Sequence, residues 1–113
     1  PVPLHKKKLS KRGYNQAACL ARALGKNMQL PVDEKLVKRV RNTEPMKRLN
    51  PAERQNNLKK AFKICQNDVK LSTIVIIDDI YTTGSTMDAM AEELHRNGVR
   101  KIYGMALASG RGV

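Results

Sequence analysis

Aromatic residues are almost missing from this chain of 113 residues. It has no Trp, one Phe and three Tyr, and its 10 acidic residues are far outnumbered by 22 Lys and Arg, which gives a net charge of +12. Nucleic-acid binding that depends on stacking bases against aromatic rings therefore has little to work with. Binding that depends on positive charge remains open.

Cysteine is also scarce. Cys19 and Cys65 stand far apart, without a CxxC pair, and with His5 and His95 they match no recognised spacing for a tetrahedral zinc site. We therefore expect two reduced, partly buried thiols and two histidines without a ligand role.

Long apolar runs are missing too. The aliphatic stretch Ile74–Ile77 is far shorter than the roughly 20 residues of a membrane-spanning helix, and no secretory signal pattern opens the chain. We expect a cytoplasmic protein without a membrane span. The length suits one domain, residues 1–113, and the strand-like opening Pro1–Leu4 predicts that this domain begins inside a larger fold.

Positive charge is concentrated in the first part of the chain. Residues 1–63 hold 17 basic and 4 acidic residues, whereas residues 64–113 hold 5 basic and 6 acidic residues. The first part is expected to meet a polyanion, such as a pyrophosphate or a nucleic acid, or to form a solvated surface. The run Lys6–Lys8 fits either a solvated loop or a nucleic-acid contact.

The first part of the chain predicts loops and short helices. Leu9–Tyr14 has the composition of a basic loop, and Gly25 is a plausible end for the helix that follows it. A short strand is expected within residues 30–40 and a basic loop at 41–49. Asn50 and Pro51 form a helix start, with that helix ending near residue 57. The first helix is expected to bury one apolar face, formed by Ala17, Leu20, Ala21 and Leu24.

The second part predicts a βαβ unit. Ser72–Ile77 is a continuous apolar run, typical of a strand buried on both faces. Ser85–Asp88 fits a capping box, Asn97-Gly98 ends the helix, and a second strand is expected at residues 99–108. The two strands of a βαβ unit lie parallel to each other in one sheet, so the predicted fold class is α/β. The helix should bury a face formed by Met87, Met90, Ala91 and Leu94.

Candidate binding residues follow the first of these strands. Asp78 and Asp79 are expected at its carboxyl end, where ligands bind in parallel sheets. The loop after them leads into the helix, so its amides and hydroxyls can cradle a phosphate. Carboxylates suit sugar hydroxyls or Mg²⁺, and the two features together predict a ribose 5-phosphate site. The loop consists of Thr82, Thr83, Gly84, Ser85 and Thr86.

A purely structural role and two rival motifs fit this stretch less well. Acids at strand ends and Thr/Ser/Gly loops at helix starts are each common for structural reasons, but their combination at this spacing favours a binding site. A strand followed by Asp-Asp also occurs in P-loop proteins, yet no GxxxxGK[ST] loop exists in the chain. The GxGxxG pattern of dinucleotide-binding folds is missing as well, with only Gly110-Arg111-Gly112 approaching it.

Three segments of the chain resemble a known family. VIIDDIYTTGST (residues 75–86) resembles the phosphoribosyl pyrophosphate (PRPP) signature of type I phosphoribosyltransferases. PVPL with RGYNQAACLARAL, and RVRNT with RQNNLKKAF, are similar to two further blocks of the competence-associated ComF family in that superfamily. The resemblance implies a parallel-sheet, Rossmann-like phosphoribosyltransferase fold, truncated at its N-terminus.

The resemblance also implies roles for individual residues. Asp78 and Asp79 would bind the ribose hydroxyls and act indirectly on Mg²⁺, and residues 82–86 would bind the 5-phosphate. The basic loop would lie against the pyrophosphate, and a flexible hood would close over the site. The loop residues are Lys11, Arg12, Gly13 and Tyr14, and the hood residues are Arg39, Arg41, Thr43 and Arg54.

The chain departs from the family pattern in two ways. The zinc module and the opening segment that usually precede the transferase domain are missing, and Met46 replaces a glutamine. The implied reaction is Mg²⁺-dependent transfer of ribose 5-phosphate from PRPP to an unknown acceptor. The alternatives are a non-catalytic PRPP sensor and an accessory factor that handles single-stranded DNA with competence proteins. Tyr14 and Phe62 are expected to anchor the core rather than stack on bases.

Overall fold

The computed structural model describes residues 1–41, 50–65 and 71–110. The N-terminal part contains the helices α1 (Lys6–Arg12) and α2 (Gln16–Met28), followed by the strand β1 (Val37–Arg39). The helix α3 (Pro51–Lys59) and the strand β2 (Phe62–Ile64) come next. The strand β3 (Thr73–Tyr81), the helix α4 (Ser85–Arg96) and the strand β4 (Lys101–Ser109) complete the order.

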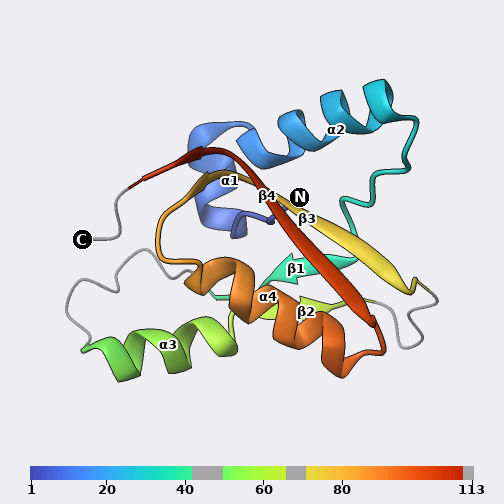
Figure 1. The fold of residues 1–113 in the computed structure, drawn as a ribbon. Helices are drawn as coiled ribbons and strands as arrows, with labels where there is room; N and C mark the ends of the chain where they lie inside the picture. Colours follow the sequence, from blue (N-terminus) through green and yellow to red (C-terminus); the bar gives the residue numbers. More distant parts are fainter. Residues whose placement is uncertain (42–49, 66–70, 111–113) are drawn as a thin grey trace.

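The predicted βαβ unit forms the centre of the fold. β3 and β4 pair in parallel, from Thr73 opposite Lys101 to Tyr81 opposite Ser109, and α4 connects them. Figure 1 shows the two strands side by side, with α2 on one side and α4 on the other. β1 and β2 form a separate antiparallel pair. The α/β class is confirmed.

The core includes the face predicted for α4 and the centre of β3. Ile76, Leu94 and Val99 are the largest fully buried side chains, and Met90 and Phe62 join the same cluster. The anchor role predicted for Phe62 is confirmed. Tyr14, in contrast, is 52% exposed, so its predicted core role is wrong.

β3 is less buried than its continuous apolar run suggests. Its centre is buried at Ile76 and Ile77, but Val75 is 42% exposed and Ile80 is 48% exposed. The prediction of a strand buried on both faces is therefore wrong for most of its length. The opening segment is not a strand either, although the amide of Val2 donates to the carbonyl of Ile77 at 2.8 Å.

Two predictions in the N-terminal part are also wrong. The basic stretch forms helix α1, which includes the Lys6–Lys8 run and ends at Gly13 with a left-handed φ of 88°. α1 has one apolar residue, Leu9, so no hydrophobic period marks it. The thiols of Cys19 and Cys65 are free but exposed rather than partly buried.

Gly25 continues α2 rather than ending it. The helix runs to Met28, and Gln29 takes the left-handed C-cap position with φ 54°. Gly25 is buried because Val32 and the carbonyl of Leu30 pack against its Cα. A glycine inside the helix therefore provides space for the returning chain, which sequence periodicity does not show.

The start of α3 follows a polar cap. Asn50 accepts from the amide of Glu53 at 2.8 Å in a complete capping box with Pro51 in the first turn, which confirms the predicted start of α3. α4 ends at Arg96 with Asn97 as its C-cap, as predicted.

Among the described residues, no helix has both the length and the apolar composition that a membrane span requires.

Gly25→Ala should destabilise the protein, although Ala is the better helix former. The new methyl group would collide with the side chain of Val32 and with a carbonyl oxygen only 2.9 Å away. We expect a loss of about 1–3 kcal/mol in the free energy of unfolding, measured by chemical denaturation. Asn27→Ala on the exposed face of α2 is the control and should change it by less than about 0.5 kcal/mol. A stabilised Gly25→Ala protein would contradict this packing.

Candidate functional site

The acid pair lies inside β3 rather than after it. The strand continues to Tyr81, so Asp78 and Asp79 are the sixth and seventh of its nine residues, and both are half-buried. Successive residues of a strand point to opposite faces, so the two carboxylates start in different directions. The amide of Asp79 donates to Asp78 Oδ1 at 2.9 Å, and the amide of Ile80 donates to Asp79 Oδ1 at 3.0 Å.

Asp78 is in an environment that disfavours its charge. Burial, followed by the neighbouring Asp79, raises the pKa of Asp78 to about 6. The cation of Arg39 opposes this shift by favouring the ionised carboxylate. The carboxylate of Asp78 therefore changes its charge near pH 6, and perturbed carboxylates of this kind often occur at functional sites.

Arg39 lies on a paired strand. It is opposite Phe62 in the β1–β2 register, and its guanidinium carbon is 5.2 Å from the centroid of the Phe62 ring. Burial lowers the pKa of Arg39, and the charge of Asp78 partly restores it. Arg39 is thus held by the packed part of the fold. Its predicted role in a hood stays a prediction.

The loop after β3 presents backbone amides at the start of α4. Gly84 is the N-cap with φ 84°, in the left-handed region that favours glycine. A Cβ at this position would lie 2.5 Å from the hydroxyl oxygen of Tyr81. The backbone angle therefore favours glycine here, whereas the exposed Tyr81 side chain could shift to relieve the close approach.

The predicted capping box at Ser85–Asp88 is wrong. No side chain caps α4 from Gly84; instead the amide of Ser85 donates to Thr83 Oγ1 at 3.3 Å, and the two hydroxyl groups are 2.9 Å apart. Within the described residues, the amides of Gly84, Thr86 and Met87 have no protein acceptor. These donors and hydroxyls stand at the positive end of a helix dipole, which is the arrangement that binds phosphate.

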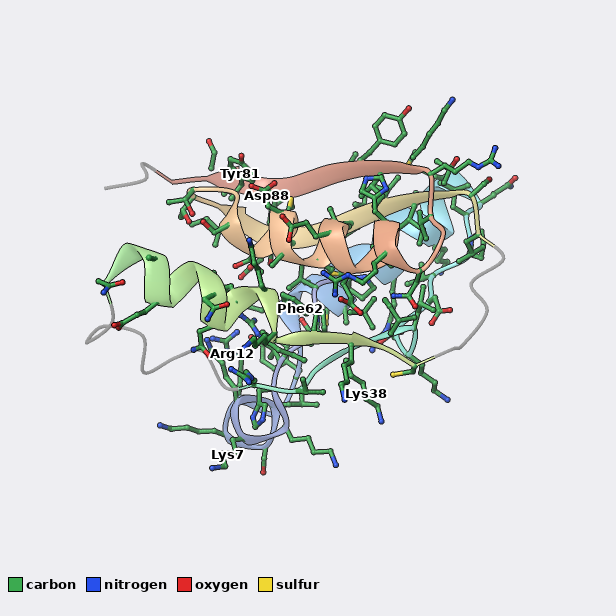
Figure 2. All side chains as sticks on the ribbon, turned by 90° about the horizontal axis from the view of Figure 1, so that it is seen from below. Lys7, Arg12, Lys38, Phe62, Tyr81 and Asp88 are labelled. Atoms are coloured by element: carbon green, nitrogen blue, oxygen red, sulfur yellow. The ribbon has the colours of Figure 1, made fainter. Side chains whose placement is uncertain are left out.

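One acid of the pair, Asp78, lies beside the loop. A small pocket of about 30 Å³ is lined by Asp78, by the loop residues 82–86 and by the residues on either side of them. A larger open groove of about 600 Å³ runs between α4 and β4, and Tyr81 and Asp88 are among the residues that line it. Figure 2 shows these two residues close to each other at one end of the molecule. The structure thus brings Asp78, predicted for ribose, together with the loop predicted for the 5-phosphate, whereas Asp79 does not line this small pocket.

The residues predicted for pyrophosphate surround the end of α1. Lys11 and Arg12 are exposed in its last turn, and Gly13 donates its amide to the carbonyl of Leu9 at 2.7 Å. Arg12 Nη1 donates to Gln16 Oε1 at 3.4 Å, which connects the two helices. Figure 2 shows Lys7 on the outer side of α1. The cations of this turn are therefore available to solvent.

The other hood residues are placed less completely. Arg41 is exposed and donates to Asn57 Oδ1 of α3 at 3.2 Å, and Arg54 lies within α3. Thr43 and Met46 fall outside the described residues. The hood therefore remains a prediction.

The side chain of Asn15 joins two segments, and the sequence did not single it out. Its side chain caps α2 and also donates to the carbonyl of Val2 at 3.0 Å. An Asn directly before a helix is a recognisable signal for a cap. The second bond joins residues 13 positions apart, so no local pattern indicates it.

The described residues do not form a complete metal cage. They contain no group of three or more His, Cys, Asp or Glu side chains that could hold a metal ion. His5 Nδ1 accepts from the amide of Lys7 at 3.2 Å, and His95 Nδ1 is 2.7 Å from the carbonyl of Val99. Both histidines thus have structural contacts, and a metal ion would depend on carboxylates and on a ligand.

Comparison with known proteins agrees with the geometry of the site. The family described as the phosphoribosyl transferase domain matches residues 9–111. Competence protein F of Haemophilus influenzae is 36% identical over 110 residues, which cover 96% of this chain and 48% of that protein. DNA utilization protein YhgH of Escherichia coli is 36% identical over 101 residues, which cover 89% of this chain and 44% of that protein.

A more distant relative agrees as well. Competence protein ComFC of Bacillus subtilis is 33% identical over 106 residues, covering 87% of this chain and 38% of that protein. The chain therefore spans half or less of the length of these relatives, and no solved structure matches it significantly. With the family match extending from α1 past β4, the chain belongs to the phosphoribosyl transferase domain family and, within it, to the ComF-like proteins.

Proposed function

We propose that this domain binds PRPP with Mg²⁺ and transfers its ribose 5-phosphate to an acceptor. The observation that carries the proposal is the pocket that Asp78 and the loop 82–86 line together. It combines a carboxylate acceptor with unpaired amides at the start of a helix. A sugar that carries a 5-phosphate offers hydroxyl donors and an anion at the corresponding positions.

The phosphate half of the proposal is supported by the loop. The amides of Gly84, Thr86 and Met87 can donate to phosphate oxygens, and α4 adds its dipole over 12 residues. The hydroxyl groups of Thr83 and Ser85 already contact each other, so they are arranged before a ligand arrives. Such preorganisation reduces the entropy that binding must overcome.

The ribose half is supported by the carboxylates. Ionised Asp78 and Asp79 would each accept from a sugar hydroxyl, because a carboxylate has two acceptor oxygens and a backbone amide engages one oxygen of each. The hydroxyls would replace part of the hydration that burial removes from Asp78. Arg39, held against Phe62, would favour the charged form required for this contact.

The donor set fits Mg²⁺ that arrives with its substrate. Mg²⁺ usually keeps several waters and binds one or two carboxylates together with substrate phosphates. Asp78 and Asp79 supply such carboxylates, and the described residues add no all-protein cage. When bound, the ion would neutralise the pyrophosphate leaving group.

The chain's own residues have definable parts in the transfer. The bond from ribose C1 to the pyrophosphate oxygen breaks with its electron pair leaving on the pyrophosphate, and the acceptor's lone pair forms the new bond at C1. Lys11 and Arg12, exposed at the end of α1, would stabilise the departing anion. The loop 82–86 would hold the 5-phosphate so that C1 stays in line with its acceptor.

A PRPP sensor would use the same contacts without transfer.

A second candidate function is DNA handling. α1 has the sequence KKKLSKR with no acid in its first turn, and Lys6, Lys7 and Lys11 are exposed. The relative YhgH carries the name DNA utilization protein. A cationic helix of this kind can bind the phosphates of single-stranded DNA without stacking, and such binding is salt-dependent.

The double substitution Asp78→Asn/Asp79→Asn should abolish Mg²⁺-dependent PRPP binding. Each Asn keeps the shape but loses the charge, and charge-assisted hydrogen bonds contribute about 1.5–3 kcal/mol. Isothermal calorimetry should show at least a roughly 10-fold loss of affinity. Glu92→Gln on the exposed face of α4 removes a comparable charge and should bind PRPP as the unchanged protein does. Lack of PRPP binding by the unchanged protein would refute the proposal.

Stability without ligand should depend on pH through Asp78. The folded protein holds this proton more tightly than the unfolded chain, because the folded pKa is about 6 against 3.8. Ionisation therefore costs stability as the pH rises through about 6. Asp78→Asn should melt higher than the unchanged protein at about pH 7.5, and the difference should vanish near pH 4. Equal melting temperatures at both values would contradict the burial of this carboxylate.

Affinity for single-stranded DNA should fall steeply with salt if α1 binds it. Neutralising Lys6, Lys7, Lys8 and Lys11 should weaken binding and flatten the slope of log affinity against log salt by about 0.7 for each phosphate that is no longer neutralised. Fluorescence anisotropy at several salt concentrations measures both quantities. The control removes the same charge from exposed positions outside α1: Lys35, Lys59, Lys60 and Lys101. Equal effects in the two variants would exclude α1 as the binding element.

A further inference from the structure

Asn15 uses both halves of its side-chain amide. Oδ1 accepts from the amide of Ala17 at 2.9 Å and from that of Ala18 at 3.3 Å, while Nδ2 donates to the carbonyl of Val2 at 3.0 Å. A helix cap requires only the acceptor half. The orientation of the amide is determined by its partners, since the carbonyl of Val2 can only accept and the two helix amides can only donate.

Val2 connects Asn15 to the strand that carries the acid pair. Its amide donates to the carbonyl of Ile77 at 2.8 Å, one residue before Asp78, and its side chain is buried in the core. Pro3 has no amide hydrogen, so the next residue offers no substitute donor. The bonds thus run from the start of α2 through Val2 to β3.

The other side of Asn15 is the turn predicted for pyrophosphate. Lys11, Arg12, Gly13 and Tyr14 directly precede it, and Arg12 also contacts Gln16 in the first turn of α2. α1 buries none of its residues, so its own packing does little to hold this turn in place. The bond from Asn15 to Val2 attaches the turn to the part of the fold that contains Asp78 and Asp79.

We infer that Asn15 is a positioning residue that sets the distance between the pyrophosphate turn and the ribose carboxylates. This inference rests on the proposed function, because the pyrophosphate turn and the ribose carboxylates must bind the same PRPP molecule. Asn15 itself touches no ligand. Its loss should weaken binding of PRPP, which spans both contacts, but not of ribose 5-phosphate, which uses only the carboxylates and the loop 82–86.

Asn15→Ser tests this directly. Serine is as good a helix cap as asparagine but is too short to cap α2 and reach Val2 together, and it adds no charge near the pyrophosphate. Calorimetry with PRPP and Mg²⁺ should show a roughly 5- to 10-fold weaker affinity, the effect of removing one hydrogen bond. The affinity for ribose 5-phosphate should remain within about twofold.

The matched control is Asn50→Ser. Asn50 caps α3 through the amide of Glu53 in the same way, and no hydrogen bond from its side-chain amide to another segment occurs among the described residues. This variant should bind both ligands as the unchanged protein does. Equal weakening of both ligands in Asn15→Ser would mean a general structural role and would overturn the inference, as would unchanged PRPP binding.

Hydrogen exchange in the unchanged protein gives a second test, which stands even where Asn15→Ser does not fold. PRPP should slow exchange of the amides of Val2, Ala17 and Ala18 together, whereas ribose 5-phosphate should leave them unchanged. If PRPP binds without slowing exchange at these amides, the role of Asn15 is refuted, but the proposed function is not. Absence of PRPP binding would refute the proposed function and, with it, the inference.

Discussion

The parallel pairing of β3 with β4 is the constraint on which the site depends. Parallel neighbours need a crossover connection, and α4 provides it in the 12 residues Ser85–Arg96. The crossover must begin where β3 ends, so the unpaired amides at the start of α4 arrive beside Asp78. The loop amides and the carboxylate of Asp78 are thus neighbours because of the sheet topology.

This arrangement conflicts with the stability of the free protein. Asp78 is held in place because it is part of β3. In this position, however, burial and Asp79 raise its pKa to about 6. Arg39 on β1, stacked on Phe62, offsets part of that cost from a segment far away in the sequence. A group whose charge is disfavoured without ligand gains most when hydroxyls or a cation arrive, so the destabilised carboxylate is consistent with a binding role.

The sequence predicted the parts of the fold in which a periodic pattern and burial coincide. The face of α4 that contains Met90 and Leu94 and the parallel order of β3 and β4 follow from hydrophobic spacing. α1 was missed because Leu9 is its only apolar residue. Gly25 was predicted to end α2, but it lies inside the helix, where Val32 from a later segment packs against it. The acids and the loop were found because they are nearly contiguous, whereas the proximity of Arg39 to Asp78 requires the tertiary fold.

Asn15 illustrates where local patterns stop being informative about a site. Its cap to α2 is encoded within three residues, but its bond to Val2 joins two segments that only the folded chain brings together. The two bonds have different consequences: the first stabilises a helix, and the second relates the exposed cationic end of α1 to the paired strand β3. If the domain binds PRPP as proposed, the affinity would depend on the distance between the pyrophosphate turn and the ribose carboxylates as well as on each contact. A residue that binds nothing can therefore determine affinity by holding that distance constant.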